Sequence, residues 1–258
     1  MQRRFEGKVA IVTGSSSGIG KATARRLAEE GAAVCIVAKH NAEGGRATAE
    51  GIRQAGGSGF FVQADVSSAE DCRRIVEETV AHCGGIDVLV NNAGITRFKA
   101  LPELDEDLWD HVLDTNLKSA YLMSRCAVPH MLGRGGAVVN VSSVHAEATY
   151  PGSAAYAASK AGLCGMTRSL ALEFGSRGVR FNCLLPGTID ISLYSRRGDA
   201  PDQETWEPRQ SPVQVLGRTG SPAEVAAGIC FLASEEASFV NGAGLTVDGG
   251  LLCVLRDH

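Results

Sequence analysis

Short runs of apolar residues alternate along this chain with longer segments of helical periodicity. The apolar runs are rich in Val and Ile, lack a regular in/out alternation and cover Val9–Val12, Val34–Ala38, Gly59–Val62, Val88–Val90, Ala137–Val141, Val179–Leu185 and Leu245–Val247. Strands that are buried on both faces of a parallel sheet have this pattern. The segments between them predict helices at Ile19–Glu30, Ala42–Ala55, Ala69–Cys83, Glu106–Met131, Ala154–Ser176 and Pro222–Ser234.

The order of these elements predicts an α/β fold. Because strands and helices alternate, we expect right-handed crossovers and a single-domain Rossmann-type doubly wound parallel sheet of about seven strands, with helices on both faces, over residues 1–258. Residues 190–217 do not fit this pattern, because they are polar, contain three prolines and have no periodicity. A loop of this length in a compact domain is typical of a lid or a binding loop, so we predict a substrate loop at about residues 190–217.

Composition and charge exclude several other classes of protein. Among 258 residues, 25 are Lys or Arg and 29 are Asp or Glu, which gives a net charge of −4 with no basic block, so no nucleic-acid role is expected. No apolar run approaches the roughly 18–20 residues of a membrane span, and Met1–Lys8 leads straight into a strand, so neither a membrane role nor a signal peptide is expected. The eight cysteines are scattered, without a C-x-x-C pair or a Cys/His cluster, and therefore predict reduced thiols in the cytoplasm and no metal site.

A glycine-rich turn follows the first predicted strand and opens the first predicted helix. It reads Thr13-Gly14-Ser15-Ser16-Ser17-Gly18-Ile19-Gly20. Glycines let the backbone turn tightly and approach a pyrophosphate, and the helix N-terminus behind them supplies free N–H groups and a partial positive charge. We therefore predict dinucleotide contacts at Gly14, Ser15, Ser16, Ser17, Gly18, Ile19 and Gly20. The spacing G-x-x-x-G-x-G resembles that of the short-chain dehydrogenase/reductase family.

The end of the second predicted strand bears on the form of the cofactor. A carboxylate there would accept hydrogen bonds from the ribose 2′-hydroxyl and favour NAD(H), but this chain has Ala38-Lys39-His40. Lys39 is able to pair with a 2′-phosphate, and NADP-dependent members of the family often look like this. Such members often also carry a basic residue where Ser17 stands, and this chain does not. The resemblance favours NADP(H), with NAD(H) as the alternative.

Further motifs of the family follow the next two strands in order. Asp65-Val66 resembles the family's adenine-contacting pair, and Asn91-Asn92-Ala93-Gly94 resembles the motif that stabilises the sheet edge beside the cofactor. The resemblance implies cofactor contacts at Asp65, Val66, Asn92, Ala93 and Gly94.

The loop after the sixth predicted strand, Pro186-Gly187-Thr188-Ile189, resembles the loop that contacts the nicotinamide carboxamide in the family. Many members then carry Thr where this chain has Ile191, which Ser192 follows. The donor to the carboxamide is therefore open between the side chain of Thr188, that of Ser192 and the backbone alone. The resemblance implies cofactor contacts at Pro186, Gly187 and, through its backbone, Ile189.

Tyr156 and Lys160 are the candidates for acid–base chemistry. They lie four residues apart in an Ala-rich helical segment, so they share one helix face. A phenol with its ordinary pKa of ~10 is a poor base at neutral pH, and a neighbouring ammonium stabilises the phenolate. The resemblance implies that both residues also contact the cofactor.

Two more polar residues complete the pattern by resemblance. Ser143 closes the fifth predicted strand 13 residues before the tyrosine, where the catalytic serine of the family stands, and its hydroxyl is suited to hold the substrate oxygen in line with the tyrosine O–H. Asn116 resembles the helix asparagine of the family, which kinks its helix and supports a water relay to the lysine. The predicted catalytic residues are therefore Asn116, Ser143, Tyr156 and Lys160.

The resemblance covers about residues 7–250 and implies a function. It implies an NAD(P)(H)-dependent oxidoreductase that interconverts a secondary alcohol and a carbonyl by hydride transfer, with the tyrosine as general acid/base. A 3-oxoacyl-(acyl-carrier-protein) reductase and a sugar or polyol dehydrogenase are narrower alternatives, and Leu172, which stands where the former often carry a basic residue, weakens that alternative. A non-catalytic nucleotide-sensing protein is the alternative from another class, which the presence of both Tyr156 and Lys160 disfavours.

The substrate is expected to meet residues after the fourth and fifth strands and in the long loop. The candidates are Thr96, Ser143, His145 and Tyr150, together with Arg97, Glu147 and parts of Tyr194–Trp206. They are mostly polar, so the sequence indicates a hydroxylated or charged small-molecule alcohol or carbonyl. The resemblance also implies a homo-oligomer, commonly a tetramer that uses the Glu106–Met131 and Ala154–Ser176 helices, with a Leu251–His258 tail that reaches a neighbour's active site or hangs free.

Overall fold

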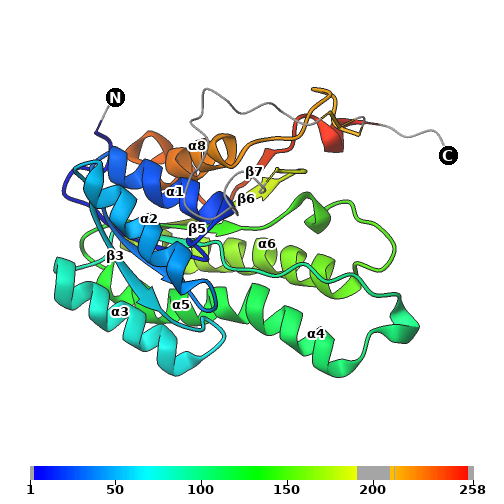
Figure 1. The fold of residues 1–258 in the computed structure, drawn as a ribbon, viewed down its shortest axis with the longest axis horizontal. Helices are drawn as coiled ribbons and strands as arrows, with labels where there is room; N and C mark the ends of the chain where they lie inside the picture. Colours follow the sequence, from blue (N-terminus) through cyan, green and yellow to red (C-terminus); the bar gives the residue numbers. More distant parts are fainter. Residues whose placement is uncertain (1–2, 191–209, 212, 255–258) are drawn as a thin grey trace.

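A parallel sheet forms the centre of the molecule in a computed structural model that describes residues 3–190, 210–211 and 213–254 (Figure 1). Within this part of the chain the sheet has seven strands in the order β3-β2-β1-β4-β5-β6-β7. The strands are β1 Val9–Thr13, β2 Ala33–Ala38, β3 Ser58–Gln63, β4 Val88–Asn91, β5 Gly136–Val141, β6 Val179–Pro186 and β7 Gly244–Val247. Their order reverses between β1 and β4, and a crevice for a ligand opens at the carboxyl ends of strands at such a point. The predicted doubly wound Rossmann-type sheet is confirmed.

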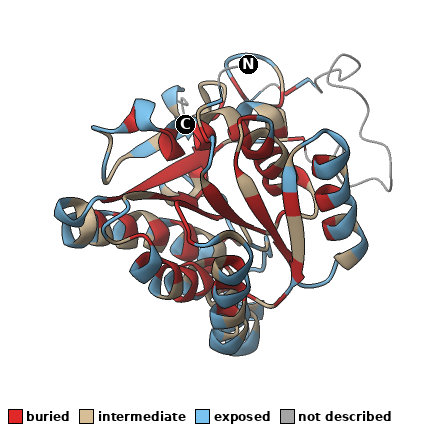
Figure 2. Cartoon of the chain, turned by 90° about the vertical axis from the view of Figure 1, so that its left-hand side faces the viewer, coloured by how far each residue is buried: buried red, intermediate tan, exposed pale blue. Residues whose placement is uncertain are grey.

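Helices cover both faces of this sheet, so that the strands are buried between two helical layers (Figure 2). The helices whose apolar side chains build the core on one face are α1 Gly18–Glu29, α2 Ala42–Gln54 and α8 Pro222–Ala233. Those on the other face are α3 Ala69–Cys83, α5 Ser119–Ala127 and α6 Ala154–Phe174. In β1, Ala10 and Val12 join the first core and Ile11 joins the second. Because both faces of each central strand are apolar, the sequence shows continuous apolar runs there.

The segment predicted as helical over Glu106–Met131 is helical in the structure but is divided into several elements. α4 covers Glu106–Leu113, a π-helical turn covers Asp114–Lys118, and α5 follows and ends in a 3-10 turn at Val128–His130. In the π-helical turn the N–H of Ser119 donates to the Asp114 carbonyl five residues back, one residue more than in an α-helix. Asn116 lies in this turn, where its resemblance to a helix-kinking asparagine led us to expect an irregularity.

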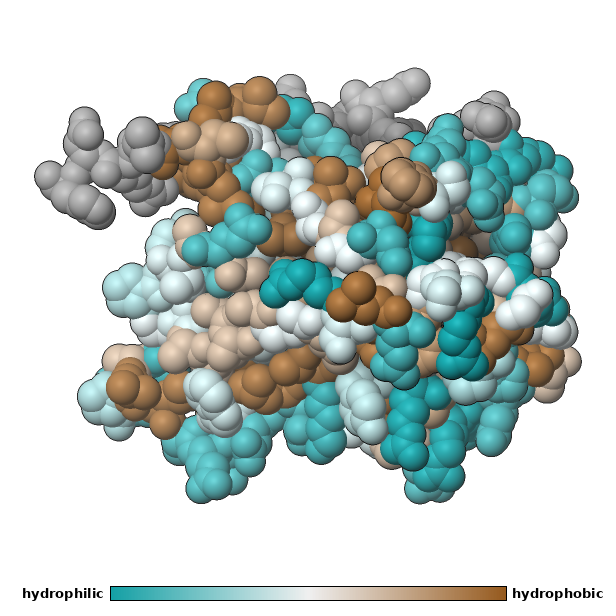
Figure 3. All heavy atoms as spheres, turned by 180° about the vertical axis from the view of Figure 1, so that it is seen from behind, coloured by the Kyte–Doolittle hydropathy of each residue, from teal (hydrophilic) through white to brown (hydrophobic). Residues whose placement is uncertain are grey.

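The predicted substrate loop at about 190–217 lies mostly outside the described residues. The C-terminal end of this loop is hydrogen-bonded to the residues directly after β7. The Leu216 N–H donates to the Gly249 carbonyl at 3.1 Å, and the Gln214 side-chain amide donates to the Asp248 carbonyl at 3.0 Å. On the face seen from behind, hydrophobic groups gather beside the C-terminal segment (Figure 3). Four exposed apolar residues lie in sequence on either side of β7, namely Val213, Val215, Leu216 and Val254.

None of the described helices combines the length and the apolar character that crossing a bilayer requires.

Candidate active site

The turn between β1 and α1 stands at the carboxyl edge of the sheet where the strand order reverses. Gly14 and Gly18 have φ angles of +64° and +53°, in the left-handed region that glycine adopts readily. A Cβ on Gly14 would stand 2.9 Å from Cα of Ala93, and a Cβ on Gly20 would overlap the Gly14 carbonyl oxygen. The absence of side chains at these glycines therefore lets the turn close tightly against the end of β4.

Helix α1 directs its amino end at this turn. In the described structure its N-cap residue, Ser17, forms no side-chain capping bond, and its first turn contains no acidic residue. The first N–H groups of a helix lack partners within the helix and lie at the positive end of its dipole, which suits them to bind a phosphate. The glycine cradle and this helix end therefore fit the pyrophosphate of a dinucleotide, as the sequence predicted.

Side chains behind the turn hold its backbone in place. The Ser15 hydroxyl donates to a β1 carbonyl at 2.6 Å and accepts from a β2 N–H at 3.0 Å, so it is occupied by the sheet. The Asn92 side-chain amide donates to the carbonyls of Thr13 and Gly14 at 2.9 and 3.1 Å. The Thr13 hydroxyl accepts from the N–H groups of Asn92 and Ala93, both at 3.0 Å. Asn92 and Ala93 thus brace the predicted phosphate-binding turn.

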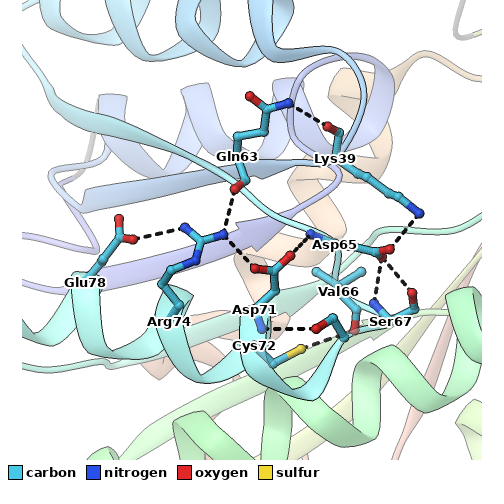
Figure 4. Close-up of polar contacts among 10 residues, drawn as sticks. Lys39, Gln63, Asp65, Val66, Ser67, Asp71, Cys72, Arg74 and Glu78 are labelled. Atoms are coloured by element: carbon cyan, nitrogen blue, oxygen red, sulfur yellow. Dashed lines mark hydrogen bonds and ion pairs between the residues drawn. The ribbon is translucent and has the colours of Figure 1, made fainter.

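Lys39, at the end of β2, forms an ion pair with Asp65, at the end of β3 (Figure 4). Lys39 Nζ lies 2.6 Å from Asp65 Oδ2, and the two side chains are 45% and 29% exposed. The N–H and the hydroxyl of Ser67 donate to Asp65 Oδ1 at 3.0 and 2.7 Å. Although partial burial of Asp65 acts in the opposite direction, the bonds from Lys39 and Ser67 hold the pKa of its carboxyl below the usual range. The carboxylate is therefore charged at neutral pH and partly neutralises the positive charge of Lys39. The sequence did not predict this ion pair.

A second row of bonds fixes the main chain of this corner (Figure 4). The Asp65 N–H donates to Asp71 Oδ2 at 2.7 Å, and the Arg74 guanidinium donates to Asp71 Oδ1 at 2.8 Å and to the Gln63 carbonyl at 2.9 Å. Val66 is buried in the core beside α3. The residues predicted to contact the adenine, Asp65 and Val66, therefore lie at one corner with Lys39.

Tyr156 and Lys160 lie one turn apart on α6. Lys160 Nζ is 5.7 Å from the centre of the Tyr156 ring, and it donates to the Val141 carbonyl at the end of β5 at 2.8 Å. The Lys160 side chain is buried, and this burial lowers its pKa to about 8. Lys160 is therefore mostly protonated at neutral pH, and a cation this close to a phenol stabilises negative charge on it.

Ser143 follows β5 at the same edge of the sheet as Lys160. Its side chain is buried, and its hydroxyl oxygen accepts from the His145 N–H at 3.2 Å at the start of the 3-10 turn Val144–Ala146. The hydroxyl of the preceding Ser142 donates to the Lys160 carbonyl at 2.7 Å, which ties the strand end to α6. The structure thus brings the predicted Ser143, Tyr156 and Lys160 to one strand end.

Asn116 joins the segment after β4 to helix α6. Its side-chain oxygen accepts from the Ile95 N–H at 2.8 Å, and its amide donates to the Ile95 carbonyl at 3.0 Å and to the Ser159 hydroxyl at 3.1 Å. A Cβ built on Gly94 would lie 3.2 Å from Asn116 Oδ1 and 3.5 Å from Lys160 Nζ. Asn116 is therefore adjacent to the lysine and has its side-chain groups occupied by protein partners.

The loop after β6 lies beside the end of β7. The Gly187 N–H donates to the Val247 carbonyl at 3.0 Å, and a Cβ on Gly187 would stand 2.7 Å from Cα of Asp248. Ile189 forms a parallel bridge with Gly220, in which the Gly220 N–H donates to the Thr188 carbonyl at 3.0 Å and the Asp190 N–H donates to the Gly220 carbonyl at 2.8 Å. This bridge uses the main-chain groups of the residues on either side of Ile189 rather than its own. Ile191, which stands where many members carry Thr, and the alternative donor Ser192 lie outside the described residues.

Sequence analysis missed the support that Gln214 gives to this loop. Its side-chain amide donates to the carbonyl of Asp248 at 3.0 Å and reaches that of Thr188 at 3.4 Å, and its side chain is buried. It comes from the predicted substrate loop, whose lack of periodicity gives no indication of which polar residue is buried.

Of the predicted substrate residues, His145 lies beside Tyr156 and Tyr150 lies beside His145. The centre of the His145 ring is 5.3 Å from that of Tyr156, and Tyr150 is 5.1 Å from His145. Thr96 is exposed in the segment after β4, and Tyr194–Trp206 lies outside the described residues. Sequence analysis missed Phe98, whose ring centre is 6.1 Å from that of Tyr156. A single aromatic residue in an exposed segment was the available signal.

Known proteins resemble this chain over nearly its whole length. The family model described as Enoyl-(Acyl carrier protein) reductase matches residues 14–252. The chain is 39% identical over 249 residues to 3beta-hydroxysteroid dehydrogenase 1 of Eggerthella lenta, which covers 96% of this chain and 94% of that protein. It is 40% identical over 245 residues to 3-oxoacyl-[acyl-carrier-protein] reductase FabG of Staphylococcus aureus, with coverage of 95% and 98%. A short-chain dehydrogenase of Burkholderia cenocepacia, solved in complex with NADP, is 37% identical with a TM-score of 0.86 over 96% of this chain and 99% of that one.

The family model and the relatives establish an NAD(P)-dependent oxidoreductase that interconverts an alcohol and a carbonyl. With its parallel sheet, its glycine turn and its match to this model over most of its length, the chain belongs to the short-chain dehydrogenase/reductase family.

Proposed function

We propose that Ser143, Tyr156 and Lys160 are the catalytic residues of this oxidoreductase and that Asn116 positions them. The observation that carries the proposal is the placement of Lys160 Nζ 5.7 Å from the Tyr156 ring centre, at the strand end that also bears Ser143. The glycine cradle for the cofactor opens at the same edge of the sheet. A proton donor, a cation and a hydroxyl therefore converge beside the place where the dinucleotide fits.

Each of the three residues has a separate task in carbonyl reduction. The Ser143 hydroxyl donates a hydrogen bond to the carbonyl oxygen of the substrate and holds it near the Tyr156 hydroxyl, which donates its proton to that oxygen. The bound nicotinamide supplies the hydride that the carbonyl carbon accepts. The Lys160 ammonium stabilises the phenolate that remains on Tyr156. In the oxidative direction this phenolate accepts the proton of the alcohol.

The Asn116 side chain acts on this cluster through the backbone. It bonds both main-chain groups of Ile95 and the hydroxyl of Ser159, the residue before Lys160. These bonds hold the segment after β4 against α6, so they fix the distance between the cofactor edge and the lysine.

For the cofactor we propose NADP(H), with NAD(H) as the alternative. The chain carries a lysine and no carboxylate at the end of β2, and a lysine there offers a positive partner to a 2′-phosphate. The Burkholderia cenocepacia relative was solved with NADP. The ion pair of Lys39 with Asp65 reduces this preference, because the carboxylate repels the same phosphate.

The narrower substrate alternatives are a 3-oxoacyl-(acyl-carrier-protein) reductase and a sugar or polyol dehydrogenase. An acidic carrier protein is bound by basic side chains, whereas Leu172 of α6 exposes 87% of its surface at the position where such reductases often carry a base. This observation favours a free small-molecule carbonyl compound or alcohol as the substrate.

We further propose a homotetramer in the cytoplasm. Tyr121 of α5 and Leu172 of α6, on the two helices expected to form contacts between subunits, are 46% and 87% exposed in the single chain. All eight cysteines are free thiols, which suits a reducing compartment. Light scattering of the purified protein measures the number of subunits, and a monomeric mass at all concentrations would contradict the assignment.

The catalytic assignment is tested with Tyr156→Phe, which removes the proton donor and keeps the ring. We expect the rate of NADPH oxidation with a panel of ketones and aldehydes to fall by about 10²-fold or more, while cofactor binding is retained. Phe239→Leu, which changes a fully exposed aromatic side chain after α8, is the control and should keep full activity. If the wild-type protein binds NADPH but turns over no carbonyl compound or alcohol, the nucleotide-sensing alternative replaces the enzymatic one.

A further inference from the structure

Three ring side chains cluster next to Tyr156: Phe98 and His145 contact its ring, and Tyr150 contacts His145. Phe98 comes from the segment after β4, His145 from the 3-10 turn after β5, and Tyr150 from the loop before α6. The Phe98 and His145 ring centres lie 6.1 and 5.3 Å from that of Tyr156, with interplanar angles of 82° and 80°. Tyr150 stands edge-on to His145 at 5.1 Å. We call Phe98, His145 and Tyr150 the ring wall.

The ring wall has a defined internal geometry. Phe98 and His145 are nearly parallel, with an interplanar angle of 28° and 5.9 Å between their centres, and Tyr150 and Tyr156 stand almost perpendicular to His145. Such offset-stacked and edge-to-face arrangements are the favourable ones for aromatic groups. His145 is at the centre of the wall, and its main-chain N–H donates to the Ser143 hydroxyl at 3.2 Å, so the turn that carries the His145 ring is bonded to Ser143.

Much of the aromatic surface of this wall is open. Phe98 and Tyr150 are 52% and 48% exposed, although large apolar side chains are usually covered. An exposed group of aromatic residues beside catalytic groups is characteristic of a ligand-binding surface. Because Phe98 and His145 lie beside the Tyr156 ring, this surface is where the substituent of a bound carbonyl group would lie.

The charge state of His145 also suits an uncharged ring. Partial burial lowers the pKa of its imidazole, so the ring is neutral at neutral pH, and its Nδ1 lies 2.8 Å from the Thr149 hydroxyl oxygen. The nearest charged residues in sequence are Arg97, Lys99 and Glu147, which are exposed. The Arg97 guanidinium donates to the Thr96 carbonyl at 2.9 Å, and Lys99 Nζ lies 3.5 Å from Glu103 Oε2, so both cations have partners outside the wall. The wall therefore presents ring faces and edges rather than a charge.

We propose that the ring wall selects carbonyl compounds whose carbonyl carbon carries a planar aromatic ring, and the corresponding benzylic alcohols. This inference rests on the proposed catalytic roles of Ser143 and Tyr156. The aromatic ring of the substrate packs against Phe98 and Tyr150 while its carbonyl oxygen meets the Ser143 and Tyr156 hydroxyls. The reaction is the reduction already described, with the hydride and the proton delivered to the same carbonyl group.

The test compares acetophenone with cyclohexyl methyl ketone, which has a saturated ring of similar size. We expect kcat/KM for acetophenone to exceed that for cyclohexyl methyl ketone by about tenfold in the wild-type enzyme, because only the former offers an aromatic face and edge. Phe98→Leu and Tyr150→Leu keep apolar volume but remove a ring, so each should reduce this ratio several-fold, mainly through KM for acetophenone. Leu101→Ala, which changes a more exposed apolar residue in the segment after β4, is the control and should leave the ratio unchanged.

Several outcomes would overturn the proposal. The proposal fails if the wild-type enzyme shows a ratio near one, or if Phe98→Leu and Tyr150→Leu keep the wild-type ratio. It also fails if kcat/KM for glucose or for a 3-oxoacyl thioester is higher than that for acetophenone. If no carbonyl compound is turned over, the catalytic roles fail, and the ring wall is then tested by calorimetric binding of acetophenone to the protein loaded with oxidised cofactor. Binding that Phe98→Leu weakens several-fold would support the wall, and unchanged or undetectable binding would refute it.

Discussion

Replacing Asp65 by Asn tests how the ion pair at the end of β2 and β3 controls the choice of cofactor. The change removes the carboxylate charge that lies 2.6 Å from Lys39 Nζ, and it keeps an oxygen that is able to accept the two hydrogen bonds from Ser67. Lys39 then offers its full charge to a 2′-phosphate. We therefore expect tighter binding of NADPH and little change in the binding of NADH, which lacks this phosphate.

The size of the effect follows from the repulsion that Asn removes. A charge-assisted contact between Lys39 and a phosphate oxygen is about 2.8 Å long, so a phosphate that meets the ammonium from the other side lies roughly 6 Å from the Asp65 carboxylate. Both side chains are partly exposed, so the dielectric constant of water applies, and a phosphate of about two charges is repelled by about 1.4 kcal/mol. Screening at physiological ionic strength reduces this to about 0.7 kcal/mol. The dissociation constant of NADPH should therefore fall by a factor of about 3–10.

The assay is titration of each variant with NADPH and with NADH, at low and at physiological salt. Glu50→Gln is the matched control, because it makes the same change in net charge and releases Arg53, its partner at 2.6 Å, near the start of β3 and away from the cofactor edge. It should leave both dissociation constants unchanged. Lys39→Ala should weaken NADPH several-fold and NADH hardly at all. If Asp65→Asn changes the two dissociation constants by the same factor, or weakens NADPH, the electrostatic reasoning is refuted.

Three further predictions concern the cradle, the buried lysine and a helix cap. Gly20→Ala should abolish tight binding of both cofactors in the same titration, because the added Cβ would overlap the Gly14 carbonyl; retained affinity would refute the predicted cradle. Lys160→Met is tested by urea unfolding of the variant and the wild-type protein across a range of pH. The free energy of unfolding of the wild-type protein should rise relative to that of the variant between pH about 8 and the ordinary lysine pKa of 10.5, because over that interval the folded lysine has lost its proton and the unfolded one keeps it. A difference in the free energy of unfolding that stays constant with pH would contradict the burial of the charge. Ser221→Ala should lower the free energy of unfolding by about 1 kcal/mol, because the Ser221 hydroxyl accepts from the Glu224 N–H at the start of α8, and an unchanged urea midpoint would contradict this role of the cap.

The sheet was predictable because each of its central strands has a recognisable local sequence pattern. In β1, Ala10, Ile11 and Val12 are all buried, so a continuous apolar run is the direct consequence of a strand covered on both faces. The glycine turn was predictable for a similar reason, since the positive φ of Gly14 and Gly18 restricts the residue type at those positions.

Features that depend on residues far apart in the sequence were not predictable in this way. The ion pair between Lys39 and Asp65 results from the pairing of β2 with β3, which brings Ala38 opposite Gln63 and aligns the residues that follow. The side-chain bonds of Asn116 reach Ile95, 21 residues earlier, and a periodicity pattern carries no such information. Phe98 lies in an exposed segment, where neither burial nor periodicity distinguishes a functional residue from a neutral one.

The parallel direction of all the strands gives this protein one chemically active rim and one inert rim. Each segment that the cofactor or substrate is expected to meet follows the carboxyl end of a strand, whereas Gly133 stands just before β5 at the opposite rim, and a Cβ built on it would meet no atom within 4 Å. An affinity handle or a tether to a solid support inserted at that position would leave the reactive rim facing the solution. The same chain is thus well suited to use as an immobilised biocatalyst that is oriented by its own architecture.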